Sequence, residues 1–395
     1  MNNNWNTLKL HDICKFKYGA GLPKRNRIKG EFPVYGSGGI VDYHNDYLIK
    51  GPGIIIGRKG TIGSVYFEKR NFFPIDTVFY IEENKKKYNI RFLYFLLGNL
   101  GLDRLNSDAA VPGLNRNVAH LQKINLPNCA IQNKIASILS AYDDLIENNN
   151  RRIKILEEMA QTIYKEWFVN FRFPGHEKVK MVDSELGKIP EGWDIKQISD
   201  IIVIKSGFAF KSDTFNIEGK YGIVTIKNVQ DRLFIHKCQN FIDVIPENMS
   251  KHCLLKSGDI ILSLTGNVGR VCLVFGDNYL LNQRVAKLVP KSDSDWAYIY
   301  FLYLNPDFRK TLENISIGAA QQNLSPIEMG KLKINYPEKS ILSLFAKVCN
   351  PILENIVFLF RKNVLLQESR DLLLPKLISG EIDVEDLDIK TEDTE

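Results

Sequence analysis

The chain has 395 residues, roughly two to three times the length of a typical domain, so we expect more than one hydrophobic core. Its apolar fraction of 44% and charged fraction of 25% are ordinary for a soluble globular protein. No basic-then-apolar leader follows Met1, and no apolar run approaches the roughly 18 residues of a membrane span, so we expect a cytoplasmic protein.

The formal net charge of +6 is unevenly distributed along the chain. Residues 381–395 hold eight acids against Lys390, a charge of −7, so residues 1–380 carry +13. A basic excess of this size is compatible with a polyanionic partner such as DNA. The acidic tail is expected to be a solvated, disordered end.

The six cysteines are scattered, which argues against a disulfide framework or a zinc ribbon. The neighbouring pair His252 and Cys253 is no better a metal site, because adjacent residues rarely chelate one ion. We therefore expect the thiols to be small buried apolar groups and predict no metal site. The cysteines are Cys14, Cys129, Cys238, Cys253, Cys272 and Cys349.

Five segments of the first half recur in the same order in the second half. They are residues 5–10 with 193–198, 18–19 with 206–207, 50–56 with 256–262, 60–63 with 266–269, and 123–127 with 333–337. The offset grows from 188 to 206 and then 210 residues, so the second copy has longer loops. An internal repeat of this kind predicts two diverged copies of one architecture.

Each copy mixes predicted strands and helices. The runs 54–56 and 260–262 are short, apolar and bounded by turn residues, which is typical of buried strands. Residues 92–97 and 298–302 favour helices that end near Gly98 and Pro306. The fold class predicted for each copy is therefore mixed α and β, and that of the whole chain is α+β.

Beyond each copy the apolar residues follow a heptad pattern typical of a coiled coil. In the first helix they are Ile135, Leu139, Tyr142, Ile146, Ile153, Leu156, Ala160, Ile163 and Trp167, with one polar position at Asn149. In the second they are Leu342, Phe345, Cys349, Ile352, Ile356, Leu359, Leu366, Leu373 and Leu377, with polar Asn363 and Arg370. Pro351 predicts a kink or break near the start of the second helix, and Pro375 weakens its last layer.

The two heptad patterns can be aligned as an antiparallel pair in which Asn149 faces Asn363. All other layers are then apolar except Tyr142 with Arg370, which can stack. A matched polar layer is a known device for setting register, because a shift would bury each asparagine against an apolar residue. The alternative is two separate amphipathic helices, each packed on its own domain.

Motifs that would indicate catalysis are incomplete. The segment Asn305-Pro306-Asp307-Phe308 approaches an amino-methyltransferase motif but lacks the second proline and a glycine-rich cofactor loop, so a helix stop fits better. The glycines of residues 53–59 have the wrong spacing for a P-loop. We therefore expect no catalytic residues.

Polar loops flanked by glycine lie at equivalent places in both copies. Arginine suits guanine, asparagine and glutamine suit adenine, and lysine or loop amides suit phosphates. Ordinary surface turns remain the alternative for any single residue. The candidate DNA-contacting residues are Tyr35, Ser37, Arg58, Lys59, Thr61, Asn115, Arg116, Thr265, Asn267, Arg270, Gln283, Arg284, Gln321, Gln322 and Asn323.

With these motifs the chain resembles the specificity (S) subunits of type I restriction–modification systems over nearly its whole length. The resemblance is carried by the repeated loops 58–63 and 265–269 and by residues 113–127, which lead to Gln132 and the first long helix. Where the family has a proline-rich turn and a Glu-Gln pair, this chain has residues 128–132, and the second copy lacks the glutamine.

The resemblance implies a domain plan and a set of partners. The plan is a first target-recognition domain (1–131), a central conserved helix (132–175), a second target-recognition domain (176–338), a C-terminal conserved helix (339–380) and the acidic tail (381–395). The implied partners are double-stranded DNA with a bipartite, asymmetric site, two methyltransferase subunits, and restriction subunits. S-adenosylmethionine, ATP and Mg²⁺ would bind those partners, and this chain would hold no cofactor.

Two other functions remain open at the level of the sequence. One is a stand-alone DNA methyltransferase with a degenerate motif, and the other is a coiled-coil scaffold with two protein-binding heads. Only DNA binding should weaken steeply with salt, through release of counterions.

Overall fold

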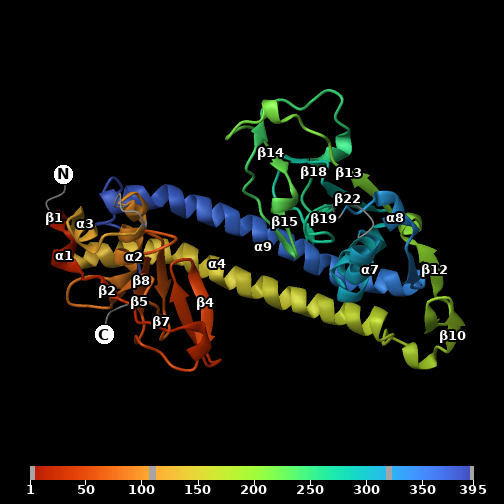
Figure 1. The fold of residues 1–395 in the computed structure, drawn as a ribbon, viewed down its shortest axis with the longest axis horizontal. Helices are drawn as coiled ribbons and strands as arrows, with labels where there is room; N and C mark the ends of the chain where they lie inside the picture. The colour runs from red at the N-terminus through yellow and green to blue at the C-terminus, as the bar shows by residue number, and fades with distance from the viewer. Residues whose placement is uncertain (1–4, 106–112, 317–322, 392–395) are drawn as a thin grey trace. The chain divides into compact units, whose positions relative to one another are not determined.

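The computed structural model describes residues 5–105, 113–316 and 323–391 (Figure 1). The chain forms two compact units: unit 1 comprises Met1–Glu147 with Leu365–Glu395, and unit 2 comprises Asn148–Val364. Each unit contains one copy of the repeat and a part of both long helices. The domain boundaries expected from the sequence, which keep each helix whole, stay a prediction.

Unit 1 contains a four-stranded antiparallel sheet in the order β2-β8-β5-β6 and a three-stranded sheet in the order β4-β3-β7. A separate antiparallel pair, β1 with β9, joins the two ends of the copy. The strands are β1 (Trp5–Lys9), β2 (Lys17–Tyr18), β3 (Phe32–Gly36), β4 (Gly39–His44), β5 (Gly53–Gly57), β6 (Val65–Glu68), β7 (Phe73–Pro74), β8 (Val78–Glu82) and β9 (Lys123–Pro127). The predicted strand 54–56 is therefore the fully buried centre of β5.

Helix α2 packs over the unit 1 sheet and places Phe92, Leu93 and Leu97 in the core. Its first turn is capped by Asn89, whose side-chain oxygen accepts a hydrogen bond from the backbone N–H of Phe92. The predicted helix is thus confirmed. The unit 1 helices are α1 (Leu10–Ile13), α2 (Ile90–Asn99) and α3 (Arg116–His120), with 3₁₀ turns η1 (Lys24–Asn26) and η2 (Leu102–Arg104).

Unit 2 repeats this topology. Its sheets have the orders β13-β22-β19-β20 and β17-β14-β21-β18, and β12 pairs with β23 as β1 pairs with β9. The corresponding strands are β12 (Asp194–Gln197), β13 (Ile202–Ser206), β14 (Tyr221–Val224), β17 (Phe241–Ile242), β19 (Ile260–Ser263), β20 (Val271–Leu273), β21 (Tyr279–Leu281), β22 (Val285–Pro290) and β23 (Lys333–Tyr336). The second sheet of unit 2 has one strand more, β18 (Leu254–Leu255), which pairs with β21. The predicted internal repeat is therefore a repeat of structure.

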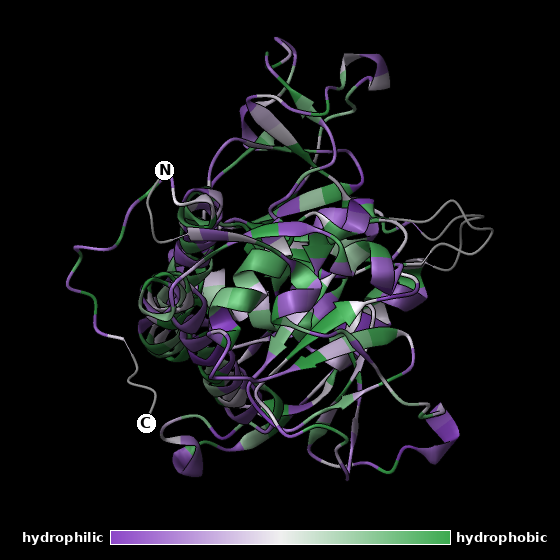
Figure 2. Cartoon of the chain, turned by 90° about the vertical axis from the view of Figure 1, so that its left-hand side faces the viewer, coloured by the Kyte–Doolittle hydropathy of each residue, from purple (hydrophilic) through white to green (hydrophobic). Residues whose placement is uncertain are grey.

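Unit 2 differs from unit 1 mainly by added short elements. The hairpins β10 (Met181–Ser184) with β11 (Gly187–Pro190) and β15 (Val229–Gln230) with β16 (Leu233–Phe234) have no counterpart among the strands in the described part of unit 1. The helices of this copy are α5 (Ile198–Ile201), α6 (Trp296–Leu304), α7 (Pro306–Ser316) and α8 (Pro326–Lys331). The 3₁₀ turns are η4 (His176–Lys178), η5 (Ser212–Thr214), η6 (Ile226–Asn228), η7 (Lys251–Cys253) and η8 (Asp293–Asp295), and the π-helical turn η3 (Lys165–Val169) follows α4. Coloured by hydropathy, many packed strands and helices are green and many outer loops purple (Figure 2).

The long helices α4 (Cys129–Tyr164) and α9 (Lys339–Ser379) pack together in the predicted antiparallel register. The side-chain amide of Asn149 donates to Asn363 at 2.8 Å. The ring centres of Trp167 and Phe345 lie 5.9 Å apart. Trp167 comes eighteen residues after Asn149, and Phe345 comes eighteen residues before Asn363. Two matched layers running in opposite directions exclude the alternative of helices packed only on their own domains.

Two details of the helix prediction need correction. Helix α9 runs through Pro351, so the break expected there is absent, while the alternative of a kink stays a prediction. Arg370 does not stack on Tyr142; its guanidinium forms ion pairs with Asp143 and Asp371. Asp143 follows Tyr142 in the sequence, and its carboxylate is a stronger partner for the Arg370 guanidinium than the face of the Tyr142 ring would be.

Helix α9 is both long and apolar. Among the described residues it is the one helix long and apolar enough to cross a membrane, with a mean hydropathy of 1.5 over its most apolar window. Within that window 44% is buried inside the protein, which includes heptad positions such as Phe345 and Cys349. The helix core therefore accounts for much of this apolarity.

The start of the acidic tail is packed, which corrects the expectation of a disordered end. Val384 is only 2% exposed and belongs to the unit 1 core. The side chain of Lys134 donates to the backbone oxygen of Glu385 at 2.6 Å, and Ser137 donates to that of Lys390 at 2.9 Å. The tail thus lies along α4 as far as residue 391.

The cysteines behave mostly as expected. Cys14, Cys253, Cys272 and Cys349 are buried, and burial raises the pKa of the Cys14 thiol to about 12. Cys129 is exposed at the start of α4, so the expectation of burial is wrong there.

Candidate nucleic-acid interface

In unit 1 the glycine loop between β5 and β6 is closed by its own backbone. The N–H of Gly57 donates to Ser64 at 2.8 Å, and that of Gly63 donates to Gly57 at 2.9 Å. Gly63 has a left-handed φ of 70°, and a Cβ there would lie 2.2 Å from the backbone nitrogen of Asp103. The loop therefore requires glycine at this position.

The equivalent loop of unit 2, between β19 and β20, is closed in the same way. Ser263 N–H donates to Arg270 at 2.9 Å, and Gly269 N–H donates to Ser263 at 3.0 Å. Gly269 has a φ of 80°. The match of these hydrogen bonds at an offset of 206 residues shows that the two loops have one backbone design.

Two further segments are tied to each glycine loop. In unit 1, Lys59 bridges to Gly113, and the backbone N–H of Arg58 donates to Thr77 at 3.0 Å. In unit 2 the same two ties are made by Thr265 with Asn323 and by Leu264 with Arg284, the second at 2.9 Å. We call each set of three segments a loop cluster: residues 57–64, 75–77 and 113–116 in unit 1, and 263–270, 282–284 and 323–325 in unit 2.

The loop clusters unite most of the residues predicted to contact DNA. The unit 1 cluster holds Arg58, Lys59, Thr61, Asn115 and Arg116. The unit 2 cluster holds Thr265, Asn267, Arg270, Gln283, Arg284 and Asn323. The predicted contacts Gln321 and Gln322 lie outside the described residues.

In unit 1, two arginines of the cluster lie over one exposed aromatic ring. The guanidinium carbons of Arg58 and Arg116 are 5.1 Å and 5.0 Å from the centre of the Tyr18 ring. Neither arginine has an acidic partner within the described part of the chain. The nearby Lys59 and Thr61 are exposed.

The surroundings of Arg116 are positively charged. Burial lowers the pKa of His120, and the cations Arg116, His11 and Lys15 lower it further. The neutral His120 ring accepts a hydrogen bond from the backbone N–H of Phe16 at 3.0 Å. This end of unit 1 therefore favours an anionic partner.

Two predicted contacts in unit 1 are wrong because their side chains are internal. Tyr35 is 5% exposed, and its hydroxyl donates to the buried Glu68 at 2.9 Å. Ser37 is 7% exposed and donates to the backbone oxygen of Thr77 at 2.7 Å. Both stabilise the sheet that supports the loop cluster.

Asn115 has a local role that conflicts with the adenine contact expected of it. Its side-chain oxygen caps α3 by accepting hydrogen bonds from the backbone N–H groups of Asn117 and Val118 at 2.9 and 3.3 Å. A bidentate adenine contact needs that same oxygen as an acceptor.

In unit 2 the polar side chains of the cluster divide into exposed and tethered groups. Asn267, Gln283 and Arg284 are exposed. Arg270 donates to the side chain of Gln230. The hydroxyl of Thr265 is buried and finds no hydrogen-bond partner in the part of unit 2 that the structure describes.

The sequence analysis missed residues that hold these loops in place. In unit 2, Arg309 of α7 binds both carboxylate oxygens of Asp231 and donates to the backbone oxygen of Gly269 at 2.6 Å. Burial would raise the pKa of Asp231, but the hydrogen bonds from Arg309 outweigh it and lower that pKa. The internal repeat offered a signal for Arg309. Arg309 follows Gly269 by the same number of residues as Asp103 follows Gly63, and Asp103 lies against Gly63.

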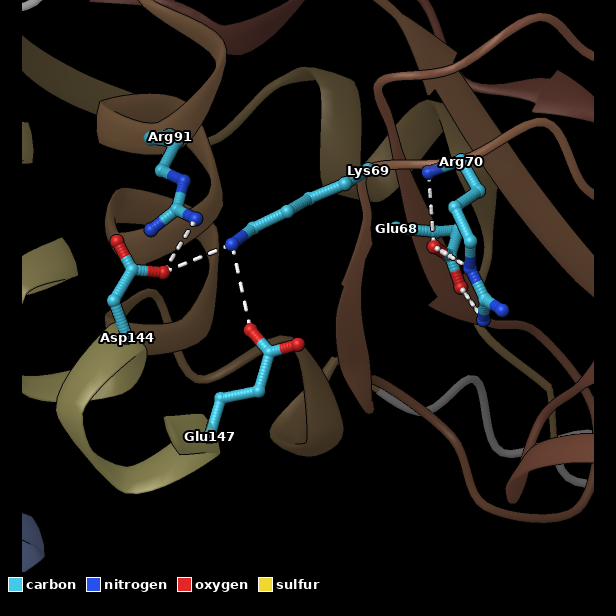
Figure 3. A network of polar contacts seen from close by, with 6 residues as sticks. All are labelled: Glu68, Lys69, Arg70, Arg91, Asp144 and Glu147. Carbon is cyan, nitrogen blue, oxygen red and sulfur yellow. Dashed lines mark hydrogen bonds and ion pairs between the residues drawn. The ribbon is translucent and has the colours of Figure 1, made fainter. Parts of the chain in front are cut away.

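Three other cations of unit 1, Lys69, Arg70 and Arg91, are paired with acids. Figure 3 shows Lys69 and Arg91 converging on Asp144 of α4, at 2.9 and 3.1 Å, with Glu147 beside Lys69. Arg70 pairs with Glu68 at 3.1 Å in the same view. The ion pairs of Lys69 and Arg91 with Asp144 connect the end of β6 and the start of α2 to α4.

The partial methyltransferase motif is a helix junction. The side-chain oxygen of Asn305 accepts hydrogen bonds from the backbone N–H groups of Asp307 and Phe308, at 2.8 and 3.2 Å. Asn305 thus ends α6 and caps α7, as the helix-stop interpretation predicts, and its oxygen is occupied.

Comparisons with known proteins agree with this arrangement. Residues 2–158 and 190–355 both match the family model described as "Type I restriction modification DNA specificity domain". The MjaIX specificity subunit of Methanocaldococcus jannaschii is 28% identical, over 97% of this chain and 95% of its own length. The MjaVIII specificity subunit of the same organism is 26% identical, over 92% and 85%.

A solved structure shares the fold. The type I restriction–modification S subunit from M. genitalium matches with a TM-score of 0.64 at 18% identity, covering 96% of this chain and 97% of its own. The duplicated loop clusters, the antiparallel helices and the two family matches lead to one conclusion. The chain belongs to the type I restriction–modification DNA specificity family and is the DNA specificity subunit of such a system, a non-catalytic component.

Proposed function

We propose that this subunit reads a bipartite, asymmetric DNA site, with the loop cluster of each unit contacting one half-site. The observation that carries the proposal is that one backbone framework occurs twice with different side chains. Unit 1 presents Arg58 and Arg116, whereas unit 2 presents Asn267, Gln283 and Arg284. Different side chains on one framework should recognise different bases.

The chemistry of the clusters suits DNA. Arginine binds guanine through O6 and N7, and amide side chains bind adenine. Exposed lysine and loop amides, as at Lys59 and Gly60, can hold phosphates and so set the position of the protein on the duplex. The acidic tail balances a basic chain, because residues 1–380 carry +13 and residues 381–395 carry −7.

The proposed protein partners are two methyltransferase subunits and restriction subunits, which would bind S-adenosylmethionine, ATP and Mg²⁺. Large apolar side chains on the long helices are exposed and could dock a methyltransferase subunit. Leu372 of unit 1 is 71% exposed, and Phe358 of unit 2 is 61% exposed. We also propose that the complex works in the cytoplasm, where its DNA would be.

The decisive experiment is to co-express the chain with a methyltransferase subunit of the same system and to map methylated adenines in host DNA. We expect methylation at one bipartite sequence. Exchanging residues 180–338 for those of a homologue should change one half-site only. Methylation at unrelated sequences, or a change in both half-sites, would contradict the proposal.

A coiled-coil scaffold with protein-binding heads would behave differently in salt. For the complex assembled with the methyltransferase, DNA affinity should fall steeply with rising salt. The reason is that lysine and arginine side chains of the protein displace counterions from the DNA phosphates when it binds. Affinity that is independent of salt would favour the scaffold.

A further inference from the structure

The two loop clusters differ most at three positions around one exposed ring. Tyr18, Arg58 and Arg116 of unit 1 correspond in the repeat to Ser206, Leu264 and Pro326 of unit 2. The strands carrying the first position match as well, because β2 pairs with β8 as β13 pairs with β22. Unit 2 therefore lacks both arginines and the ring on an otherwise equivalent framework.

The ring is well placed to orient both arginines. Tyr18 is 49% exposed, and its inner side packs on Phe79 at 5.0 Å between ring centres. Arg58 lies over both rings, 5.9 Å from the centre of Phe79. Cation–π contact with a tyrosine anchored in this way restricts where each guanidinium can point.

The arginine pair is unsatisfied in the described structure. The two guanidinium groups lie 5.1 Å and 5.0 Å from the same ring centre, so two positive charges gather around Tyr18. The Nε of Arg58 is buried and has no hydrogen-bond partner among the described residues. Two neighbouring cations without an acid favour a ligand that supplies several acceptors.

We propose that Tyr18 is a specificity-positioning residue, which orients Arg58 and Arg116 so that the pair reads guanine in the half-site of unit 1. This inference rests on the proposed function, since it presupposes that the unit 1 cluster contacts DNA. Guanine is the base that offers two acceptors, O6 and N7, to one guanidinium in the major groove. A phosphate would offer acceptors too, and the variants below separate the two ligands.

The test uses the full-length subunit assembled with its methyltransferase, and it compares Tyr18→Phe with Tyr18→Leu. Methylation is measured on a library containing every single-base change of both half-sites. Tyr18→Phe keeps the ring and should keep wild-type discrimination. Tyr18→Leu should relax discrimination by roughly tenfold at one or two guanines of the unit 1 half-site, leaving the other half-site unchanged.

Ser206→Ala, at the equivalent position of unit 2, is the matched control and should change neither half-site. A melting curve for each variant separates loss of discrimination from loss of folding. If Tyr18→Leu is folded and discriminates as the wild type does, the inference is overturned while the proposed function stands. If the wild-type complex shows no sequence preference, the proposed function itself fails.

Lysine substitutions identify the ligand. Arg58→Lys and Arg116→Lys keep the charge but lose the planar fork. If the pair reads guanine, these variants should lose base discrimination while keeping the salt dependence of DNA binding. Unchanged discrimination in both variants would show that the arginines contact phosphate only, and would overturn the proposal.

Discussion

At the scale of single residues, the two glycine loops have one backbone shape, but the serine hydroxyl that stabilises it comes from opposite ends of the two loops. In unit 1 the hydroxyl of Ser64 donates to the backbone oxygen of Thr61 at 3.0 Å. In unit 2 the equivalent oxygen, of Asn267, accepts from Ser263, which stands at the opposite end of its loop. The end without the serine is Gly57 in unit 1 and Arg270 in unit 2.

Gly57→Ala should destabilise unit 1. The new Cβ would lie 2.0 Å from the backbone oxygen of Thr61, so the loop would have to shift. We expect a loss of about 1–3 kcal/mol, which is typical of overpacking, seen as a lower melting temperature with weaker DNA binding. Ser263→Ala, at the equivalent position, removes the hydrogen bonds of the hydroxyl with Asn267 and Arg270 but adds no atom that clashes, so it should cost less. A larger effect for Ser263→Ala would contradict the assigned loop geometry.

Stability should depend on pH through Glu157 of α4. Burial raises the pKa of Glu157 to about 7, although Arg232 opposes this. An unfolded chain has a glutamate pKa of about 4.3. Between these values the folded state binds more protons, so stability should fall as pH rises from about 4.3 to 7 and then level off.

Unfolding of wild type and Glu157→Gln by urea at pH 5 and pH 8 would check this. The variant cannot ionise, so its midpoint should fall less between the two pH values. Glu354→Gln, on the exposed side of α9, serves as the control and should follow the wild type. Equal pH dependence in Glu157→Gln and wild type would refute the assignment.

At the scale of elements, the long helices are held in register by a polar layer inside an apolar seam. Asn149 donates to Asn363, which in turn donates to Asn150 at 2.9 Å. Asn149 and Asn363 are only 3% and 6% exposed. A shifted register would leave these amides without partners in an apolar layer.

Asn363→Leu should destabilise the protein by about 1–3 kcal/mol, because the buried amide of Asn149 would lose its partner. The double variant Asn149→Leu with Asn363→Leu removes both polar groups and should recover most of that stability, at the expense of a unique register. Thermal melting measures the first effect. Intramolecular disulfide cross-linking between cysteines at Leu156 and Ile356 measures the second. A double variant less stable than the single one would show that the layer stabilises rather than selects the pairing.

At the scale of the whole molecule, the chain combines a basic body with an acidic end, and part of that end is structural. Val384 completes the unit 1 core, and two side chains of α4 hold the backbone of the tail. The tail therefore contributes packing as well as charge.

Deleting residues 381–395 should lower the melting temperature of the protein, even though it removes seven net negative charges from a DNA-binding chain. Val384→Ala keeps every charge and should reproduce part of the loss, about 1–3 kcal/mol for a buried valine. If the deletion raised DNA affinity without lowering stability, the tail would act through its charge alone.

The parts of this structure that the sequence predicted are those with a repeating pattern. Strands β5 and β19, helices α2 and α6, and the helix register follow from short periodic signals that tertiary contacts reinforce. The DNA contacts predicted at Tyr35 and Ser37 were wrong because a polar side chain beside glycine can lie in an exposed loop or make a buried hydrogen bond, and the local sequence is the same in both cases. Burial depends on what packs above the strand, and no local pattern encodes that.

The duplication, the α+β class of the two copies and the pairing of Asn149 with Asn363 could all be inferred from the order of residues along the chain. Each of these depends on residue spacing, which is a property of the chain alone. Which loops meet could not be inferred in this way, because the contacts of Lys59 with Gly113 and of Tyr18 with Arg116 join segments far apart in sequence. The tertiary structure decided this, and it also decided that the tail is packed, since the burial of Val384 depends on a groove built by other parts of unit 1.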